Sequence, residues 1–424
     1  MRTLEARDTT ANCAHMTEAL TRFPPTRTAA LEALQRFVPL AGRDYAARRN
    51  YDLGRDGHTG VSQLSPYVRC RLLTEEEVLE AVLGRFSPST AEKFIQEVYW
   101  RTYWKGWLEM RPAVWDQYQA DLRRELDNVQ TQGGLRARWE AACSGDTDID
   151  CFNAWSRELT ETGYLHNHAR MWFASIWIFT LQLPWQLGAD FFLRHLLDGD
   201  PASNTLGWRW VAGQQTPGKT YLARTSNISK YTEGRFAPKW QLAGEAPPVP
   251  GRPNPDRQAL RPGGQLTMTE RTGLLLHDDD LSPGYLLDRG LAPVATGCLN
   301  TRTDLSPLQI APHVEAFAEG AITDVTARYA GRLGTVSSLD GTVAAIENWA
   351  AEHALDQIVM PDTPIGPNAS LVANLSRIAG LPPVIRIRRD YDAAAWPHAT
   401  HGFFRFKDKI PSLLRQLRGM HIAQ

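Results

Sequence analysis

The sequence predicts a mostly helical protein, in which an all-helical domain is followed by a small α/β domain with a doubly wound sheet. The first observation is hydrophobic periodicity of the helical kind, which dominates residues 41–239. The second is a Pro- and Gly-rich stretch, residues 241–264, with few large apolar side chains. The third is a set of short apolar runs after that stretch, separated by helical patterns, as expected for buried parallel strands that alternate with helices.

These patterns divide the chain into four segments. We expect a polar leader with a first helix, a helical domain, a linker, and an α/β domain with a C-terminal helical segment, at residues 1–40, 41–240, 241–266 and 267–424. The clearest helices are predicted at residues 74–83, 91–109, 149–161, 166–183 and 341–353. The clearest strands are predicted at residues 273–277, 291–297 and 356–361.

Composition excludes several classes of protein. Hydrophobic residues make up 43% and charged residues 22% of the 424-residue chain, and the net charge is only −1, so bulk charge does not argue for nucleic-acid binding. The five cysteines are scattered and fit neither a zinc site nor a disulfide framework, so we expect no bound metal and a reducing, cytoplasmic setting. The longest apolar run, residues 171–185, is too short to span a membrane.

A loop that leads into a helix is predicted at residues 57–77, with the sequence GHTGVSQLSPYVRCRLLTEEE. Free hydroxyls and backbone N–H groups at a helix start can hold phosphates. On this segment alone, a plain N-cap at Ser65 with Pro66 at the first helical position is the simpler interpretation.

The segment at residues 91–107, within the helix predicted at 91–109, carries an unusual face. The residues Glu97, Trp100, Arg101 and Trp104 follow one another at helical spacing, so they share that face. The ordinary interpretation is an interhelical salt bridge with Trp packing. The functional interpretation is a pocket that stacks flat rings and exchanges hydrogen bonds.

Two further segments, TGYLHNHARM at residues 162–171 and DGDPASNTLGWRW at residues 198–210, give the strongest functional pattern. In the first, Asn167, Arg170 and Met171 share a helix face. In the second, Asp198 and Asp200 form an acidic turn. No His or further Asp at a fitting spacing completes a metal site there.

These two motifs, preceded by VSQLSPY and EVYWRTYW in this order, resemble the FAD-binding domain of DNA photolyases and cryptochromes. The resemblance covers about residues 41–240. It implies an all-helical domain that holds FAD in a bent form. It also implies that a photolyase-type FAD-binding domain precedes an antenna-domain-like α/β domain, whereas most photolyases have the opposite order. Binding of a second, antenna chromophore is therefore left open.

The resemblance assigns roles at the cofactor. Asn204 matches the residue beside flavin N5, and Asn is typical of photolyases there. Tyr51 is an alternative to Tyr45 for an upstream contact, and Val61 replaces a usual Thr, which affects one phosphate contact. The residues that match FAD-contacting positions are Tyr45, Ser62, Leu64, Ser65, Arg101, Arg170, Asp198, Asp200 and Asn204.

The resemblance also assigns roles in DNA repair. Trp208 and Trp185 match the first two members of the family's electron-transfer chain of tryptophans. The usual third Trp is absent from residues 121–132. Either Trp115, Trp139 or a Tyr takes its place, or the electron-transfer chain has fewer members. With Glu97 and Asn204, Trp208 and Trp185 are the expected catalytic residues. A flipped-out pyrimidine dimer would contact Glu97, Trp100, Asn167, Met171 and Trp210.

The implied function is light-driven, FAD-dependent repair of pyrimidine dimers, with damaged DNA as partner and a monomeric protein. The alternative is a cryptochrome-like blue-light sensor without repair activity. Asn204, Glu97, Trp100 and Asn167 favour repair, whereas weak basicity, the missing third Trp and the domain order favour sensing. A (6-4) photolyase is disfavoured, because that group usually has His where Asn167 stands.

Overall fold

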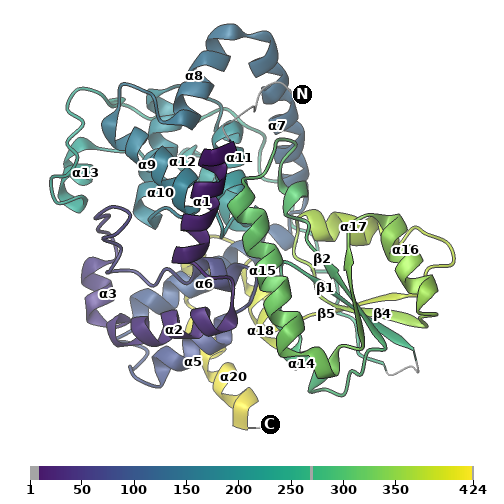
Figure 1. Ribbon diagram of the computed structural model, residues 1–424. Coiled ribbons are helices and arrows are strands. Elements are labelled where there is room, and N and C mark those ends of the chain that lie inside the picture. The colour runs from purple at the N-terminus through teal and green to yellow at the C-terminus, as the bar shows by residue number, and fades with distance from the viewer. Residues whose placement is uncertain (1–8, 268–270, 423–424) are drawn as a thin grey trace.

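A helical part and an α/β part lie side by side in the molecule, with the long helix α15 running between them (Figure 1). The computed structural model describes residues 9–267 and 271–422. The helical part is built first along the chain, and residues 232–267, which contain no helix or strand, lead towards the sheet. This order agrees with the predicted fold class.

Local sequence signals set the helix boundaries of the helical part. Thr74 and Glu77 form a reciprocal capping box at the start of α5, and Pro201 follows the capping residue Asp200 at the start of α12. Gly145 and Gly163 end α8 and α9 with positive φ angles of 65° and 67°. The helices are α1 (Thr9–Arg22), α2 (Arg27–Phe37), α3 (Arg43–Arg48), α4 (Ser65–Arg69), α5 (Glu75–Leu83), α6 (Glu92–Glu109), α7 (Ala113–Thr131), α8 (Gly133–Ser144), α9 (Asp150–Thr162), α10 (Asn167–Ser175), α11 (Trp185–His195), α12 (Pro201–Val211) and α13 (Thr225–Tyr231).

Shorter turns join several of these helices. The π-helical turn η2 (Ile176–Thr180) continues α10, so the helix predicted to residue 183 changes its hydrogen-bond pattern after Ser175. The remaining turns are the 3₁₀ segments η1 (Val38–Leu40), η3 (Arg302–Leu305), η4 (Ala330–Arg332) and η5 (Trp396–His398).

The segment expected as a leader contains two helices. α2 buries Ala30, Leu34 and Phe37, and α1 packs against α9 and α15. These helices therefore contact both the helical part and the α/β part.

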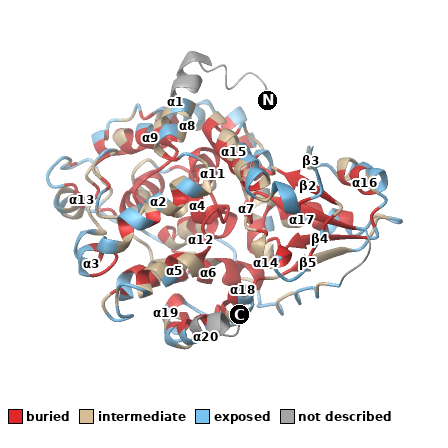
Figure 2. Cartoon of the chain, turned by 60° about the horizontal axis from the view of Figure 1, so that its bottom comes forward, coloured by how far each residue is buried: buried red, intermediate tan, exposed pale blue. Residues whose placement is uncertain are grey.

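The sheet has five parallel strands in the order β3-β2-β1-β4-β5, which is the doubly wound arrangement that the alternating pattern predicts. The central strands are fully buried (Figure 2), as expected for a sheet covered on both faces. The strands are β1 (Thr272–His277), β2 (Ala295–Leu299), β3 (Thr335–Leu339), β4 (Gln357–Pro361) and β5 (Val384–Ile387). The helices between them are α14 (Gly284–Leu287), α15 (Pro312–Arg328), α16 (Val343–Glu352) and α17 (Pro367–Leu375).

Two features of the sheet differ from the sequence prediction. The strand predicted at residues 291–297 is shifted, because pairing with β1 begins only at Ala295, two residues after Pro293, which has no amide hydrogen to donate. The edge strands β3 and β5 were not predicted. β3 is largely exposed and lacks an apolar run, since it has a neighbour on one side only.

The C-terminal helices return to the helical part. α18 (Asp390–Ala395), α19 (Phe403–Lys407) and α20 (Ile410–Ile422) follow the last strand, and α18 and α19 pack against α6. The hydroxyls of Thr102 and Tyr391 lie 2.8 Å apart, and the Tyr103 hydroxyl donates to the carbonyl of His401 at 2.7 Å. The predicted C-terminal helical segment is thus attached to the helix that carries Glu97 and Trp100.

Buried ion pairs join the two parts at the carboxyl end of β1. Arg69 from α4 pairs with Asp279, and Arg71 contacts Asp280 at 3.0 Å. Arg389 also binds Asp280, with its Nε 2.7 Å from Oδ2. This edge of a doubly wound sheet is where such folds usually bind ligands. In this protein the buried ion pairs attach that edge of the sheet to the helical part.

None of the helices among the described residues is both long enough and apolar enough to cross a lipid bilayer.

Candidate functional site

A cavity of about 270 Å³ lies in the helical part, between the loop that precedes α4 and the helices α6 and α10. Many of the predicted site residues line it. From the predicted cofactor set these are Tyr45, Ser62, Leu64, Ser65, Arg101, Arg170 and Asp198, and from the predicted substrate set they are Glu97, Asn167 and Met171.

The loop before α4 turns tightly at Gln63 and is held by its own side chains. Gln63 adopts a positive φ of 52°, and its side-chain amide donates to the carbonyl of His58 at 3.1 Å. The hydroxyl of Ser62 accepts a hydrogen bond from the amide of Leu64 at 3.4 Å. Ser65 is the first residue of α4, so the N-cap position falls on Leu64, one residue earlier than the simple interpretation placed it.

Asp198 and Arg170 form an ion pair at the cavity wall. Arg170 donates from Nη2 to Asp198 Oδ2 at 2.8 Å and from Nε to the carbonyl of Leu165 at 2.8 Å. The other carboxylate oxygen, Asp198 Oδ1, is buried and has no hydrogen-bond partner among the described residues. A buried carboxylate oxygen of this kind can accept a hydrogen bond from a ligand hydroxyl.

Asp200 lies behind the cavity, where it caps α12. Its carboxylate accepts from the amide of Ser203 at 2.8 Å and lies 3.6 Å from Arg101 and 3.8 Å from Lys105. Burial alone would raise the pKa of Asp200, but Lys105 and Arg101 outweigh burial and hold that pKa well below its usual value. The carboxylate is therefore charged at neutral pH and fixes Arg101 at the cavity.

Asn204 and Trp208 share one face of α12, one turn apart. The amide of Asn204 donates to the carbonyl of Ala189 at 2.8 Å, which fixes its orientation. Trp208 is buried against Phe192, with ring centroids 5.1 Å apart. Neither residue lines the cavity. Trp185, at the start of α11, is buried as well.

Two predicted substrate contacts, Trp100 and Trp210, have their rings in contact with other aromatic rings. Trp100 stacks on Phe403 of α19, with centroids 3.6 Å apart and planes at 12°. Trp210 stacks on Tyr221 with centroids 5.6 Å apart. Neither lines the cavity, in contrast to Glu97, Asn167 and Met171. Stacking of both rings on flipped bases stays a prediction.

Sequence reasoning missed the partner of Glu97. Arg49, from the turn after α3, forms an ion pair with the Glu97 carboxylate and lines the cavity. Burial raises the pKa of Glu97, and Arg49 opposes that effect. The run RRN at residues 48–50 was the available signal, but basic runs are usually solvated faces.

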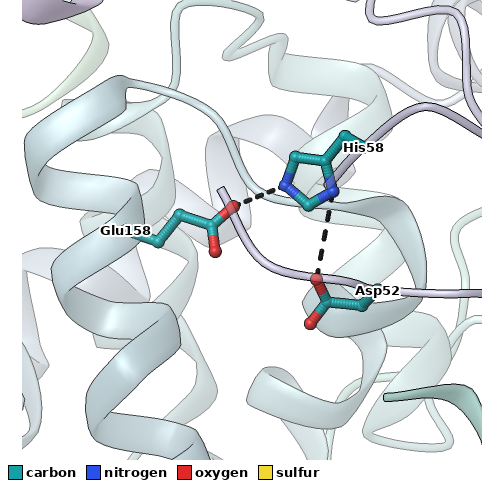
Figure 3. Close-up of side chains that lie close together, drawn as sticks. All are labelled: Asp52, His58 and Glu158. Carbon is teal, nitrogen blue, oxygen red and sulfur yellow. Dashed lines mark hydrogen bonds and ion pairs between the residues drawn. The ribbon is translucent and has the colours of Figure 1, made fainter. Parts of the chain in front are cut away.

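A buried cluster of Asp52, His58 and Glu158 was also missed (Figure 3). His58 Nε2 lies 2.6 Å from Glu158, and Nδ1 lies 3.9 Å from Asp52. Asp52 Oδ2 already accepts hydrogen bonds from Trp155 at 2.7 Å and Arg235 at 3.0 Å. The cationic Arg235 disfavours a metal ion, so we interpret the cluster as structural support for the loop that carries Ser62.

The donor set around the cavity fits FAD. The hydroxyls of Ser62 and Ser65 and the helix start at α4 suit phosphate oxygens, and the unpartnered Asp198 Oδ1 suits a ribityl or ribose hydroxyl. Arg101 and Arg170 supply positive charge at the same wall.

Comparisons with known proteins agree with this assignment. Residues 94–240 match the family model described as the FAD-binding domain of DNA photolyase. A deoxyribodipyrimidine photo-lyase of Alkalihalophilus pseudofirmus is 31% identical over 194 residues, which cover 46% of this chain and 39% of that protein. A Synechococcus deoxyribodipyrimidine photo-lyase is 31% identical over 199 residues, which cover 45% of this chain and 40% of that protein.

A solved structure of a class III photolyase from Agrobacterium tumefaciens is 23% identical, with a TM-score of 0.43, over 52% of this chain and 45% of that chain. The chain spans less than half the length of the curated relatives it matches. These matches show that the helical part of this chain, at residues 94–240, is similar to the FAD-binding domain of DNA photolyase.

Proposed function

We propose that this protein repairs pyrimidine dimers in DNA by light-driven electron transfer from FAD. A single observation carries the proposal: one cavity is lined both by residues predicted to hold FAD and by residues predicted to contact a flipped-out dimer. Ser62, Ser65 and Asp198 belong to the first group, and Glu97 and Asn167 belong to the second. A lesion is already poorly stacked, so less energy is needed to bring it into such a cavity.

The residues of the chain have separate tasks in this proposal. FAD, when bound and reduced, supplies the electron that splits the dimer. Ser62 and Ser65 hold its phosphates, and Asp198 accepts a hydrogen bond from a sugar hydroxyl. Asn204 presents a fixed amide, because its Nδ2 is held by the carbonyl of Ala189. Glu97 accepts hydrogen bonds from the pyrimidine ring, once its ion pair with Arg49 opens.

Specific contacts favour a second candidate, a blue-light sensor without repair activity. The carboxylate of Glu97 is bound to Arg49, and one face of Trp100 is covered by Phe403. A dimer that used both residues would have to displace these partners. The family match alone supports the sensor as well as the repair enzyme, since cryptochromes share the FAD-binding domain.

A repair assay with a defined substrate separates the two candidates. Chemically reduced protein is mixed with an oligonucleotide that carries one cyclobutane thymine dimer, and recovery of thymine absorbance is followed under blue light and in the dark. We expect light-dependent recovery, lowered in Glu97→Gln. The matched control is Glu92→Gln, at an exposed position five residues earlier on α6. Absence of repair by FAD-loaded wild-type protein would leave the sensor as the function.

The proposed function implies a partner, an oligomeric state and a cellular compartment. Damaged DNA is the partner, the protein acts as a monomer, and it works in a reducing cytoplasm. Among the described residues, Cys70, Cys151 and Cys298 are buried free thiols, which supports the reducing compartment. Size-exclusion chromatography with light scattering tests the monomer, and a stable dimer would contradict it.

A further inference from the structure

The short helix α19 presents one phenylalanine to solvent at the edge of the helical part, beside α6 (Figure 2). Phe404 is 80% exposed, whereas Phe403 and Phe406 of the same helix are buried. Phe403 stacks on Trp100 of α6, with centroids 3.6 Å apart and planes at 12°. These contacts fix the inner side of α19, so the exposed ring of Phe404 is carried by an ordered element.

Two hydrogen bonds also fix the turn that precedes α19. The Tyr103 hydroxyl donates to the carbonyl of His401 at 2.7 Å, and Arg111 donates from Nη2 to the carbonyl of Thr400 at 3.0 Å. Tyr103 lies in α6, and Arg111 directly follows the C-terminal cap of that helix. Because α6 holds this segment in place, little conformational entropy remains to be lost when a partner binds to it.

Positive charge gathers around Phe404. Residues 402–417 contain four cations and one acid, whereas the net charge of the whole chain is −1. The cations are Arg405, Lys407, Lys409 and Arg415, and the acid is Asp408. Lys407 is paired with Glu92 of α6 at 3.0 Å. Arg405 and Lys409 are exposed and form no ion pair within the described part of the chain, so their charges are available to a partner.

The surroundings of Phe404 indicate which partner fits. A single exposed apolar side chain is ordinary by itself. Here the ring lies between exposed cations, on the helix that stacks on Trp100, a predicted lesion contact. Cations that bind phosphates together with a ring that stacks on a base are how proteins hold unpaired DNA. A second copy of this chain fits less well, because a symmetric contact through α19 would bring like charges together.

We propose that α19 contacts the DNA beside the lesion, where Phe404 stacks on the base next to the flipped-out dimer and Arg405 and Lys409 bind the flanking phosphates. The inference rests on the proposed function and adds a contact surface outside residues 94–240. Removing a dimer from the duplex uncovers a face of the neighbouring base. An aromatic ring that covers this face replaces the lost stacking and lowers the cost of keeping the dimer extruded.

The test measures binding of the full-length, FAD-loaded protein to a fluorescent duplex that carries one cyclobutane thymine dimer, in the dark so that the lesion is not consumed. Phe404→Ala should weaken binding by about tenfold, while the free energy of unfolding and the FAD content stay at wild-type values. Phe404→Trp keeps an aromatic ring and should bind as wild type does, whereas Phe404→Leu should bind as weakly as Phe404→Ala.

The two cations have a separate signature in the salt dependence. Arg405→Gln and Lys409→Gln should each lower the slope of log affinity against log salt concentration by about one. Matched controls come from the α/β part: Val336 is 43% exposed on β3, and Arg377 is exposed after α17. Val336→Ala and Arg377→Gln should leave affinity and slope unchanged.

Each outcome decides the inference. Wild-type affinity in Phe404→Ala, with normal repair by wild-type protein, would overturn the role of α19 and leave the proposed function standing. Loss of a wild-type dimer in Phe404→Ala, seen by light scattering, would assign the surface to a second copy instead. Damage-selective binding that depends on Phe404 in a protein without repair activity would support the DNA contact and count against the proposed repair function. Wild-type protein that binds no damaged DNA would overturn both.

Discussion

Arg69 donates from Nε to the carbonyl oxygen of Gly199 at 2.7 Å, although 130 residues separate the two in the sequence. Gly199 lies between Asp198 and Asp200, so this bond fixes the acidic turn at the candidate FAD site. The same carbonyl accepts from Arg302 of the α/β part at 3.3 Å, and Arg69 also pairs with Asp279 after β1. The α/β part thus supports the geometry of the site.

Replacing Arg69 should therefore weaken both the fold and cofactor binding. Arg69→Met leaves Asp279 buried without its ion-pair partner, which should cost about 3–5 kcal/mol of unfolding free energy. Chemical denaturation and the flavin content of purified protein measure the two effects. The control is Arg332→Met, whose pair with Asp288 is exposed and should contribute no more than about 1 kcal/mol. Equal loss in both variants would contradict the supporting role of Arg69.

Glu109 should make stability fall as pH rises. Its carboxylate oxygen accepts from the amide of Ile365 at 2.6 Å, and burial raises its pKa from 4.5 to about 7. A raised folded pKa stabilises the protein below the unfolded pKa, and this stabilisation is lost as pH rises through the folded pKa. Glu109→Gln keeps the acceptor but cannot ionise, so its stability should decline less than that of wild type between pH 4.5 and 7. Chemical denaturation at several pH values gives the free energy of unfolding of both proteins. The same decrease in both between pH 4.5 and 7 would refute the prediction.

Asp198 should contribute to cofactor affinity through its unpartnered oxygen. Asp198→Ala removes that acceptor and leaves Arg170 without its partner, so FAD should bind more weakly by about 1.5–3 kcal/mol. Titration of the apoprotein with FAD, followed by flavin fluorescence, gives the affinity. Asp198→Asn retains an acceptor oxygen and should lose less. If the two variants bind FAD as tightly as wild type, the cavity does not hold the cofactor.

The stack of Phe403 on Trp100 should stabilise the return of the C-terminal segment to α6. Phe403→Ala should lower the free energy of unfolding by about 3–5 kcal/mol, because the ring is buried. The neighbouring Phe404 is 80% exposed and supplies a matched control, since Phe404→Ala should change stability by less than about 0.5 kcal/mol. Urea denaturation followed by tryptophan fluorescence measures both. Similar values for the two variants would show that the stack contributes little.

The sequence by itself determined the order of the two parts and most of the cavity wall. The helices α5, α6 and α9 begin and end within a residue or two of their predicted bounds, because periodicity and caps such as Thr74 and Gly163 act locally. The motifs that carry Ser62, Glu97, Asn167 and Asp198 identified cavity residues, since a motif is local in sequence and holds its side chains close together.

Only the tertiary structure decided which distant residues meet. The pairing of Arg49 with Glu97, the stack of Phe403 on Trp100 and the stack of Tyr118 on Trp185 all join separate elements. The shift of β2 has the same origin, because a strand's bounds depend on its neighbour. Such contacts follow from packing between elements, which local periodicity and spacing do not encode. The sequence left the substitute for the third tryptophan open, and packing between α7 and α11 places Tyr118, but not Trp115, directly against Trp185.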